Sequence, residues 1–207
     1  MKLLHLDSSI LGGNSASRTL SAAIAGQLAG QGADIVYRDL AADPLPHLTG
    51  EHFAARLGAT PVSADLQRAI ATDQAVLDEF LAADTVVIGA PFYNFGVPSQ
   101  LKAWIDRVAV AGKTFRYTAN GPEGLMAGKR VILAVSRGGF YGAGTPAAGM
   151  EHGESHLRAV FALMGITNVE VVAAEGLAIG PEQREKSLQA ALAAVTQLGP
   201  QPQLRAA

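Results

Sequence analysis

The chain contains no cysteine among its 207 residues. This absence excludes disulfide bonds, thiolate catalysis, CxxC redox chemistry and metal sites built on sulfur ligands. A protein of this composition that transfers electrons therefore needs a bound cofactor to carry them.

Charged residues are scarce as well. They make up 16% of the chain, against roughly a quarter of an average globular protein, and the formal net charge is −2. Because Lys and Arg are few and spread thinly, the sequence carries no electrostatic footprint for nucleic acid or for a membrane surface. The low charge content favours additional buried surface, such as an interface between subunits.

Long hydrophobic runs are absent too. No segment approaches the length of a transmembrane helix, and the first residues, MKLLHLDSS, are too short and too polar for a signal peptide. We therefore expect a cytoplasmic protein.

What the chain does contain is an alternation of strand-like and helix-like segments. The predicted strands are Lys2–Asp7, Asp34–Asp39, Val86–Ala90, Val131–Ser136 and Val169–Ala173. The predicted helices are Ser17–Gly30, Ala64–Ala83, Leu101–Val110, Glu151–Met164 and Pro181–Leu198, with a short helical patch at Glu51–Leu57. Five strands joined by crossover helices predict an α/β fold, a doubly wound five-stranded parallel sheet with helices on both faces.

Neither an internal repeat nor a linker interrupts this pattern, so we expect a single domain over residues 1–207. Residues 199–207, GPQPQLRAA, are expected to form a frayed tail. Gly112–Gly128 is an insertion, in which Thr114–Thr118 is strand-like and Asn120-Gly121-Pro122 indicates a turn.

The loop after the first strand is rich in small polar residues. It contains Ser9 and runs through Ser15, Ala16 and Ser17 into a helix. Hydroxyls and free backbone amides at a helix N-terminus make a site for an anion such as a phosphate monoester. The alternative is ordinary N-capping by Ser15 or Ser17. Capping needs only one serine, so the number of them favours the phosphate.

The loop after the third strand is aromatic. Phe92, Tyr93, Asn94 and Phe95 follow a buried strand and Pro91, at the carboxyl edge where ligands sit in open parallel sheets. Three aromatic side chains are costly to expose there, so we expect them to face a flat apolar partner such as a flavin ring. The alternative is that they form a local core.

The loop after the fourth strand begins Ser136-Arg137-Gly138-Gly139. Paired glycines let a ligand approach the backbone, and their amides can bond the polar edge of a ring. Taken alone, a plain flexible turn explains this loop equally well. In a sheet ordered 2-1-3-4-5, however, the three loops meet at the switch point, and together they predict a flavodoxin-like FMN site.

The chain resembles the FMN-dependent NADH-azoreductases, also described as FMN-dependent NADH:quinone oxidoreductases. The matching segments are SSILGGNSASRTL, APFYNFGVPSQLKAWID, AGKTFRYTANGPEGL, SRGG and AEG, in an order that covers nearly the whole chain. The resemblance implies that Ser9 and Ser15-Ala16-Ser17 hold the FMN phosphate. It also implies that Phe92-Tyr93-Asn94-Phe95 and Ser136-Arg137-Gly138-Gly139 hold the isoalloxazine ring.

From this resemblance we expect an enzyme that takes electrons from NADH or NADPH and reduces quinones and aromatic azo compounds. The reaction is expected to be a ping-pong, two-electron hydride transfer that needs no acid or base side chain, because the cofactor carries the chemistry. The family is dimeric, and we expect a homodimer in which Tyr117 and Phe115 of the insertion contact substrate. Two departures concern the pocket: the family often has Met at the position of Phe92, and the loop Arg137–Met150 is rich in Gly and Ala.

Other functions fit less well. A flavodoxin-like electron carrier or a general flavin reductase remains the alternative, although a carrier is typically smaller and more acidic. Gly112-Lys113-Thr114 imitates the end of a P-loop but lacks its leading glycine. His152 and His156 have a metal-compatible spacing without a third ligand, so no metal is predicted.

Overall fold

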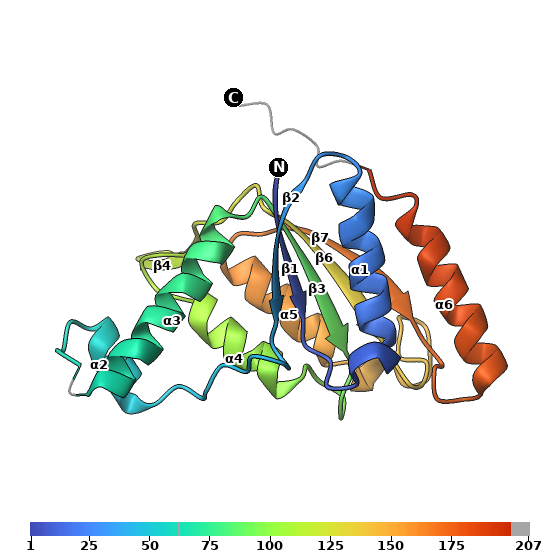
Figure 1. The fold of residues 1–207 in the computed structure, drawn as a ribbon, viewed down its shortest axis with the longest axis horizontal. Coiled ribbons are helices and arrows are strands. Elements are labelled where there is room, and N and C mark those ends of the chain that lie inside the picture. The colour runs from blue at the N-terminus through green and yellow to red at the C-terminus, as the bar shows by residue number, and fades with distance from the viewer. Residues whose placement is uncertain (62, 200–207) are drawn as a thin grey trace.

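The computed structural model describes residues 1–61 and 63–199 (Figure 1). Its core is a five-stranded sheet of parallel strands in the order β2-β1-β3-β6-β7. The strands are β1 (Lys2–Asp7), β2 (Asp34–Asp39), β3 (Thr85–Pro91), β6 (Arg130–Ser136) and β7 (Asn168–Ala174). Because β4 and β5 form a separate hairpin, this is the predicted order 2-1-3-4-5, and that prediction is confirmed.

The central strands are apolar because both of their faces are covered. Every residue of β3 is buried, and Ile88 pairs with Leu6 of β1 and with Leu133 of β6. Gly89 interrupts the run for a steric reason. A Cβ at this position would lie 2.4 Å from the carboxylate Oδ1 of Asp7, so only glycine lets the strand pass there.

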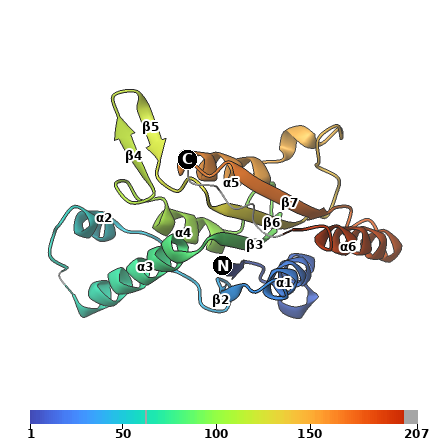
Figure 2. The same ribbon diagram turned by 90° about the horizontal axis from the view of Figure 1, so that it is seen from above.

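Helices cover both faces of the sheet (Figure 2). One face carries α1 (Ala16–Ala29) and α6 (Pro181–Val195), which pack on Leu3, Val87 and Ile132. The other face carries α3 (Ala64–Ala82), α4 (Ser99–Val108) and α5 (Gly153–Leu163), with α2 (Gly50–Arg56) beside α3. Alternate strand residues point to opposite faces, which gives one apolar core on each side.

Several predicted boundaries are wrong by a few residues. Helix α4 begins at Ser99 rather than Leu101, and α6 ends at Val195 rather than Leu198. Helix α5 begins only at Gly153, after a 3-10 turn at Ala148–Met150. Of the expected tail, Gly199 accepts a hydrogen bond from Arg130 (2.8 Å), and residues 200–207 lie outside the described residues.

The insertion forms a hairpin of β4 (Phe115–Thr118) and β5 (Gly121–Gly124). The predicted turn at Asn120-Gly121-Pro122 is partly wrong, because Gly121 and Pro122 open β5. Gly124 passes so close to the end of α5 that a Cβ there would lie 2.0 Å from the amide nitrogen of Gly165. This contact fixes the base of the hairpin against α5, away from α1 and α6 (Figure 2).

No helix within the described residues is both long and apolar enough to cross a membrane.

Candidate functional site

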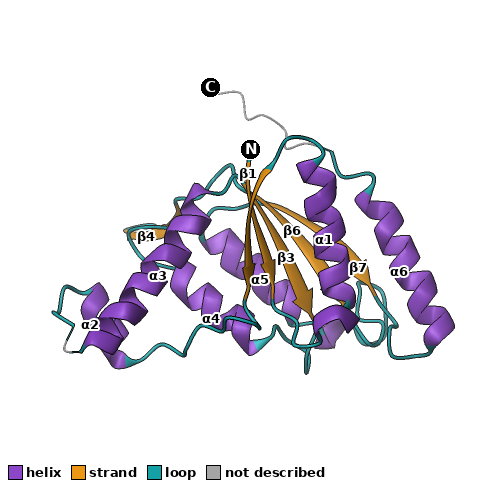
Figure 3. Cartoon of the chain, in the orientation of Figure 1, coloured by secondary structure: helices purple, strands orange, loops and turns teal. Residues whose placement is uncertain are grey.

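The loops that leave β1, β3 and β6 meet at the carboxyl edge of the sheet, at the lower edge in Figure 3. They border an open hollow with a volume of about 270 Å³, just below the roughly 300–1,000 Å³ usual for small-molecule sites. Eight of the predicted cofactor residues line it: Ser9, Ser15, Ala16, Phe92, Tyr93, Ser136, Arg137 and Gly138. The lining residues that sequence reasoning missed are Leu11, Asn14, Pro91, Leu177, Ala178 and Arg184.

At the first loop, Ser15 is the N-cap of α1, and its Oγ accepts the backbone N–H of Arg18 (3.3 Å). Ser17 is fully buried, and its hydroxyl pairs with that of Ser15 (3.0 Å) without lining the hollow. The amides of Ala16 and Ser17 have no acceptor within the helix, because the first turn lacks one. The Ser15 cap therefore leaves these two N–H groups at the helix start without an intrahelical acceptor.

Arg18 fixes the same loop from behind. Its Nη2 and Nε donate to the carbonyl oxygen of Ser9 (2.8 and 3.1 Å), while Nη1 and Nη2 donate to the carboxylate of Asp39 (2.6 and 2.7 Å). Hydrogen bonds from Arg18, joined by the amides of Ala41 and Ala42, lower the pKa of Asp39 to about 2. Sequence reasoning missed this pair because its partners are 21 residues apart.

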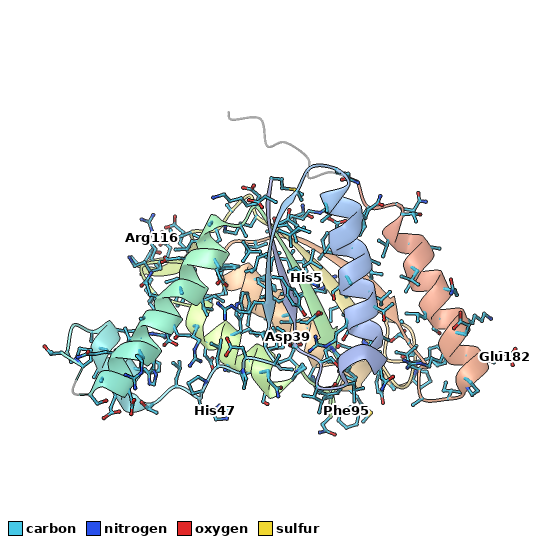
Figure 4. The ribbon with its side chains drawn as sticks, viewed as in Figure 1. His5, Asp39, His47, Phe95, Arg116 and Glu182 are labelled. Atoms are coloured by element: carbon cyan, nitrogen blue, oxygen red, sulfur yellow. The ribbon has the colours of Figure 1, made fainter. Side chains whose placement is uncertain are left out.

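The second loop is a tight hairpin turn held under strain. Tyr93 and Gly96 exchange both backbone hydrogen bonds (3.1 and 3.0 Å). Between them, Asn94 (φ 47°) and Phe95 (φ 68°) adopt left-handed backbone conformations that are costly for a bulky side chain. Such strain is found mostly at functional sites, and here it leaves Phe95 exposed at the lower edge of the molecule (Figure 4).

The same loop carries an aromatic wall. The ring of Phe92 lies 4.9 Å from that of Tyr141 and 6.2 Å from that of Phe95, measured between centroids. The hydroxyl of Tyr93 pairs with that of Ser9 (3.0 Å), which ties the second loop to the first. Tyr141 is a further contributor that the sequence pattern did not reveal.

The third loop is held by a buried ion cluster. Arg137 is 3% exposed and donates to Glu154 (2.9 Å) and Glu175 (3.0 Å), with Glu151 at 3.3 Å. Burial acts to lower the pKa of Arg137, but the bonds to Glu154 and Glu175 outweigh it, and the pKa is raised. Its charge is therefore already matched by this chain.

The backbone amides beside Arg137 are open. Gly138 and Gly139 use their carbonyl oxygens to accept from Ala178 and Gly176. Their N–H groups donate to no group among residues 1–61 and 63–199. The loop thus presents two free donors, the feature that the paired glycines predicted.

The two predicted substrate residues lie elsewhere in the chain. Phe115 is 7% exposed and packs edge-on against Tyr117, with 5.5 Å between ring centroids, whereas Tyr117 is 76% exposed. Both belong to β4, and neither lines the hollow of their own chain. Arg116, labelled in Figure 4, marks how far this strand lies from the carboxyl edge.

A second hollow lies between α2, α3 and α4, and none of the predicted site residues lines it. Its buried Arg107 is paired with Asp73 (2.7 Å) and donates to the carbonyl of Pro46. That guanidinium thus serves the packing of α3 against α4.

Comparison with known proteins identifies first the fold class of the chain and then its family. Residues 1–198 match a family described as having a flavodoxin-like fold. An azoreductase from Bacillus anthracis has the same architecture, with a TM-score of 0.85, 30% sequence identity, and coverage of 95% of this chain and 97% of that one.

Curated relatives narrow the class. An FMN-dependent NADH:quinone oxidoreductase 2 of Bradyrhizobium diazoefficiens is 58% identical over 96% of this chain and 98% of its own length. An FMN-dependent NADH:quinone oxidoreductase of Methylorubrum extorquens strain PA1 matches with the same identity and coverage, 58%, 96% and 98%. The chain therefore belongs to the family of FMN-dependent NADH:quinone oxidoreductases.

Proposed function

We propose that this chain is an FMN-dependent oxidoreductase that uses NADH to reduce quinones, with one domain over residues 1–207 carrying the site. The observation that supports this most directly is the single hollow into which three loops bring different chemistry. Serine hydroxyls and a helix start form one end, and aromatic rings and free amides form the other. A ligand with an anionic group at one end and a flat ring with a polar edge at the other matches both ends of the hollow.

The residues present fit FMN. At the anion end, Ser9, Ser15 and the amides of Ala16 and Ser17 would hold its phosphate, with Ser17 supporting the Ser15 hydroxyl. At the ring end, residues 92–95 would pack against the isoalloxazine. The free N–H groups of Gly138 and Gly139 would donate to its polar edge, where they favour negative charge.

Bound FMN would supply the redox chemistry by accepting a hydride from NADH and passing two electrons to the acceptor. The chain supplies position and electrostatics. The described residues that line the hollow include no His, Asp, Glu, Lys or Cys, and Arg137 is held by its glutamates, so the lining offers no ordinary acid or base. Water is then the proton source for the reduced product.

Because the hollow is one open space, NADH and the quinone would bind in turn against the same face of the flavin. This predicts ping-pong kinetics, and the aromatic side chains of Phe92 and Tyr93 in the lining suit aromatic azo compounds as well as quinones. Azo acceptors are also favoured by the likeness to an azoreductase structure at 30% identity.

We further propose that two chains form a homodimer in which Tyr117 reaches the hollow of the partner. An aromatic side chain that is 76% exposed on the β4–β5 hairpin supports this. Phe115 would then act by supporting the Tyr117 ring. Light scattering that finds a fully active monomer would rule out the shared pocket.

The experiment that tests the function uses the purified chain. We expect a visible flavin spectrum, complete anaerobic bleaching by NADH alone, and reoxidation by an added quinone at a rate consistent with turnover. Double-reciprocal plots should give parallel lines. An electron carrier would show the spectrum without bleaching by NADH, and intersecting lines would indicate a second nucleotide site.

A further inference from the structure

The anion end of the hollow is short of positive charge. Arg18, the arginine at this end, is paired with Asp39, and Arg137 at the ring end is paired with Glu154 and Glu175. The loop itself therefore offers an anion only the partial positive charges at the start of α1 and a few hydroxyl groups. A phosphate dianion would be held more tightly if one unmatched cation reached this end.

Arg184 is such a cation. It comes from the first turn of α6, where its backbone N–H donates to the carbonyl of Gly180 (2.9 Å). Its half-buried side chain reaches the first loop, and Nη2 donates to the carbonyl oxygen of Asn14 (3.1 Å). Arg184 lines the hollow together with Asn14, Ser15 and Ala16, and it makes no ion pair within the part of the chain that the structure describes.

The fold explains how a residue 170 positions away arrives there. Helices α1 and α6 pack side by side on one face of the sheet, and both begin at its carboxyl edge (Figure 1). Glu182, labelled in Figure 4, marks the start of α6 at this edge. The start of α1 and one unmatched guanidinium from the first turn of α6 therefore border the same end of the hollow.

We propose that Arg184 is a specificity residue for the phosphate of the flavin, which makes the site prefer FMN to riboflavin. This inference rests on the proposed function. A guanidinium is suited to the role because it stays charged at all physiological pH values and can donate two N–H bonds to one phosphate. The present bond to the neutral Asn14 carbonyl holds the side chain at the site without consuming its charge.

The test compares dissociation constants for FMN and riboflavin in the wild type and in Arg184→Gln, measured by flavin fluorescence after removal of bound flavin. Gln keeps a polar side-chain N–H group but is shorter and has no charge. We expect FMN to bind about tenfold more weakly and riboflavin to bind as before. Arg184→Lys should recover part of the loss, and added salt should weaken FMN binding more in the wild type than in Arg184→Gln.

Lys186→Gln is the matched control, because this exposed lysine lies on the same helix about 200° away around its axis. Equal FMN affinity in wild type and Arg184→Gln would overturn the inference. So would an equal loss for both flavins, or the same loss in Lys186→Gln. A wild type that binds neither flavin would instead overturn the proposed function and this inference together.

Discussion

Two arginines hold the loops at the two ends of the hollow, and they do so differently. At the anion end, Arg18 joins the Ser9 carbonyl to Asp39, which ends β2, and its Nη1 lies 3.6 Å from Asp7. At the ring end, Arg137 gathers Glu151, Glu154 and Glu175 from two further segments. The Arg137 side chain is 3% exposed and that of Arg18 is 16% exposed.

The difference shows which end tolerates change. Arg18 is a bidentate brace that water still reaches, and its main partner Asp39 is 20% exposed, so solvent can partly screen that carboxylate after Arg18 is removed. Arg137 lies among three carboxylates, and its guanidinium is also 5.8 Å from the centre of the Phe92 ring. Its removal would leave several carboxylates without their shared cation. We therefore expect the ring end to be the more costly to disturb.

The largest effect is expected from Arg137→Met. Three glutamates that are 11–23% exposed would lose their common, 3% exposed partner, so the free energy of unfolding should fall by about 3–5 kcal/mol. Urea denaturation at pH 7 measures this. Arg158→Gln is the control, because it breaks a bond to the same Glu154 from a side chain that is 46% exposed, and it should cost at most about 1 kcal/mol. A similar cost for both variants would show that the cluster is not one buried unit.

Arg18→Met should have a smaller effect on stability, about 2 kcal/mol, and should also weaken FMN binding because the Ser9 loop is released. Arg38→Met is the matched comparison. Arg38 lies on the same strand as Asp39 and is 15% exposed. It makes an equivalent bidentate pair with Glu79 but does not line the hollow. If both variants lower FMN affinity equally, Arg18 is not a loop-positioning residue.

Much of the fold could be predicted because its signals are local. Apolar β-branched runs mark the strands, and the chain order of strands and crossovers leads to the sheet order and thus to the meeting of three loops. The two braces could not be predicted, since Arg137 finds Glu154 and Glu175 at separations of 17 and 38 residues. The positive φ at Phe95 was also beyond reach, because a phenylalanine there contradicts local preference.

The smallest expected effect is on the pH dependence of stability, which should differ between the Arg18 and Arg137 clusters. Arg18 is the main cause of the lowered pKa of Asp39, about 2 in the folded protein. A carboxyl group whose pKa is depressed on folding stabilises the protein above its unfolded pKa of roughly 3.9, and this stabilisation is lost as the pH falls toward 2.

The difference in stability between wild type and Asp39→Asn should therefore be constant from pH 7 to about pH 5 and shrink below about pH 4. Arg18→Met should remove most of that pH dependence and leave only the part due to the amides of Ala41 and Ala42, as urea midpoints across the range would show. At the ring end, burial acts to raise the pKa of Glu151, but hydrogen bonds from other groups outweigh this and the pKa is lowered. The amides of Glu154 and Ser155 contribute more to this lowering than the charge of Arg137 does. Arg137→Met should consequently leave part of the acid dependence of Glu151 in place, and its complete loss would mean that both ends depend on a single arginine in the same way.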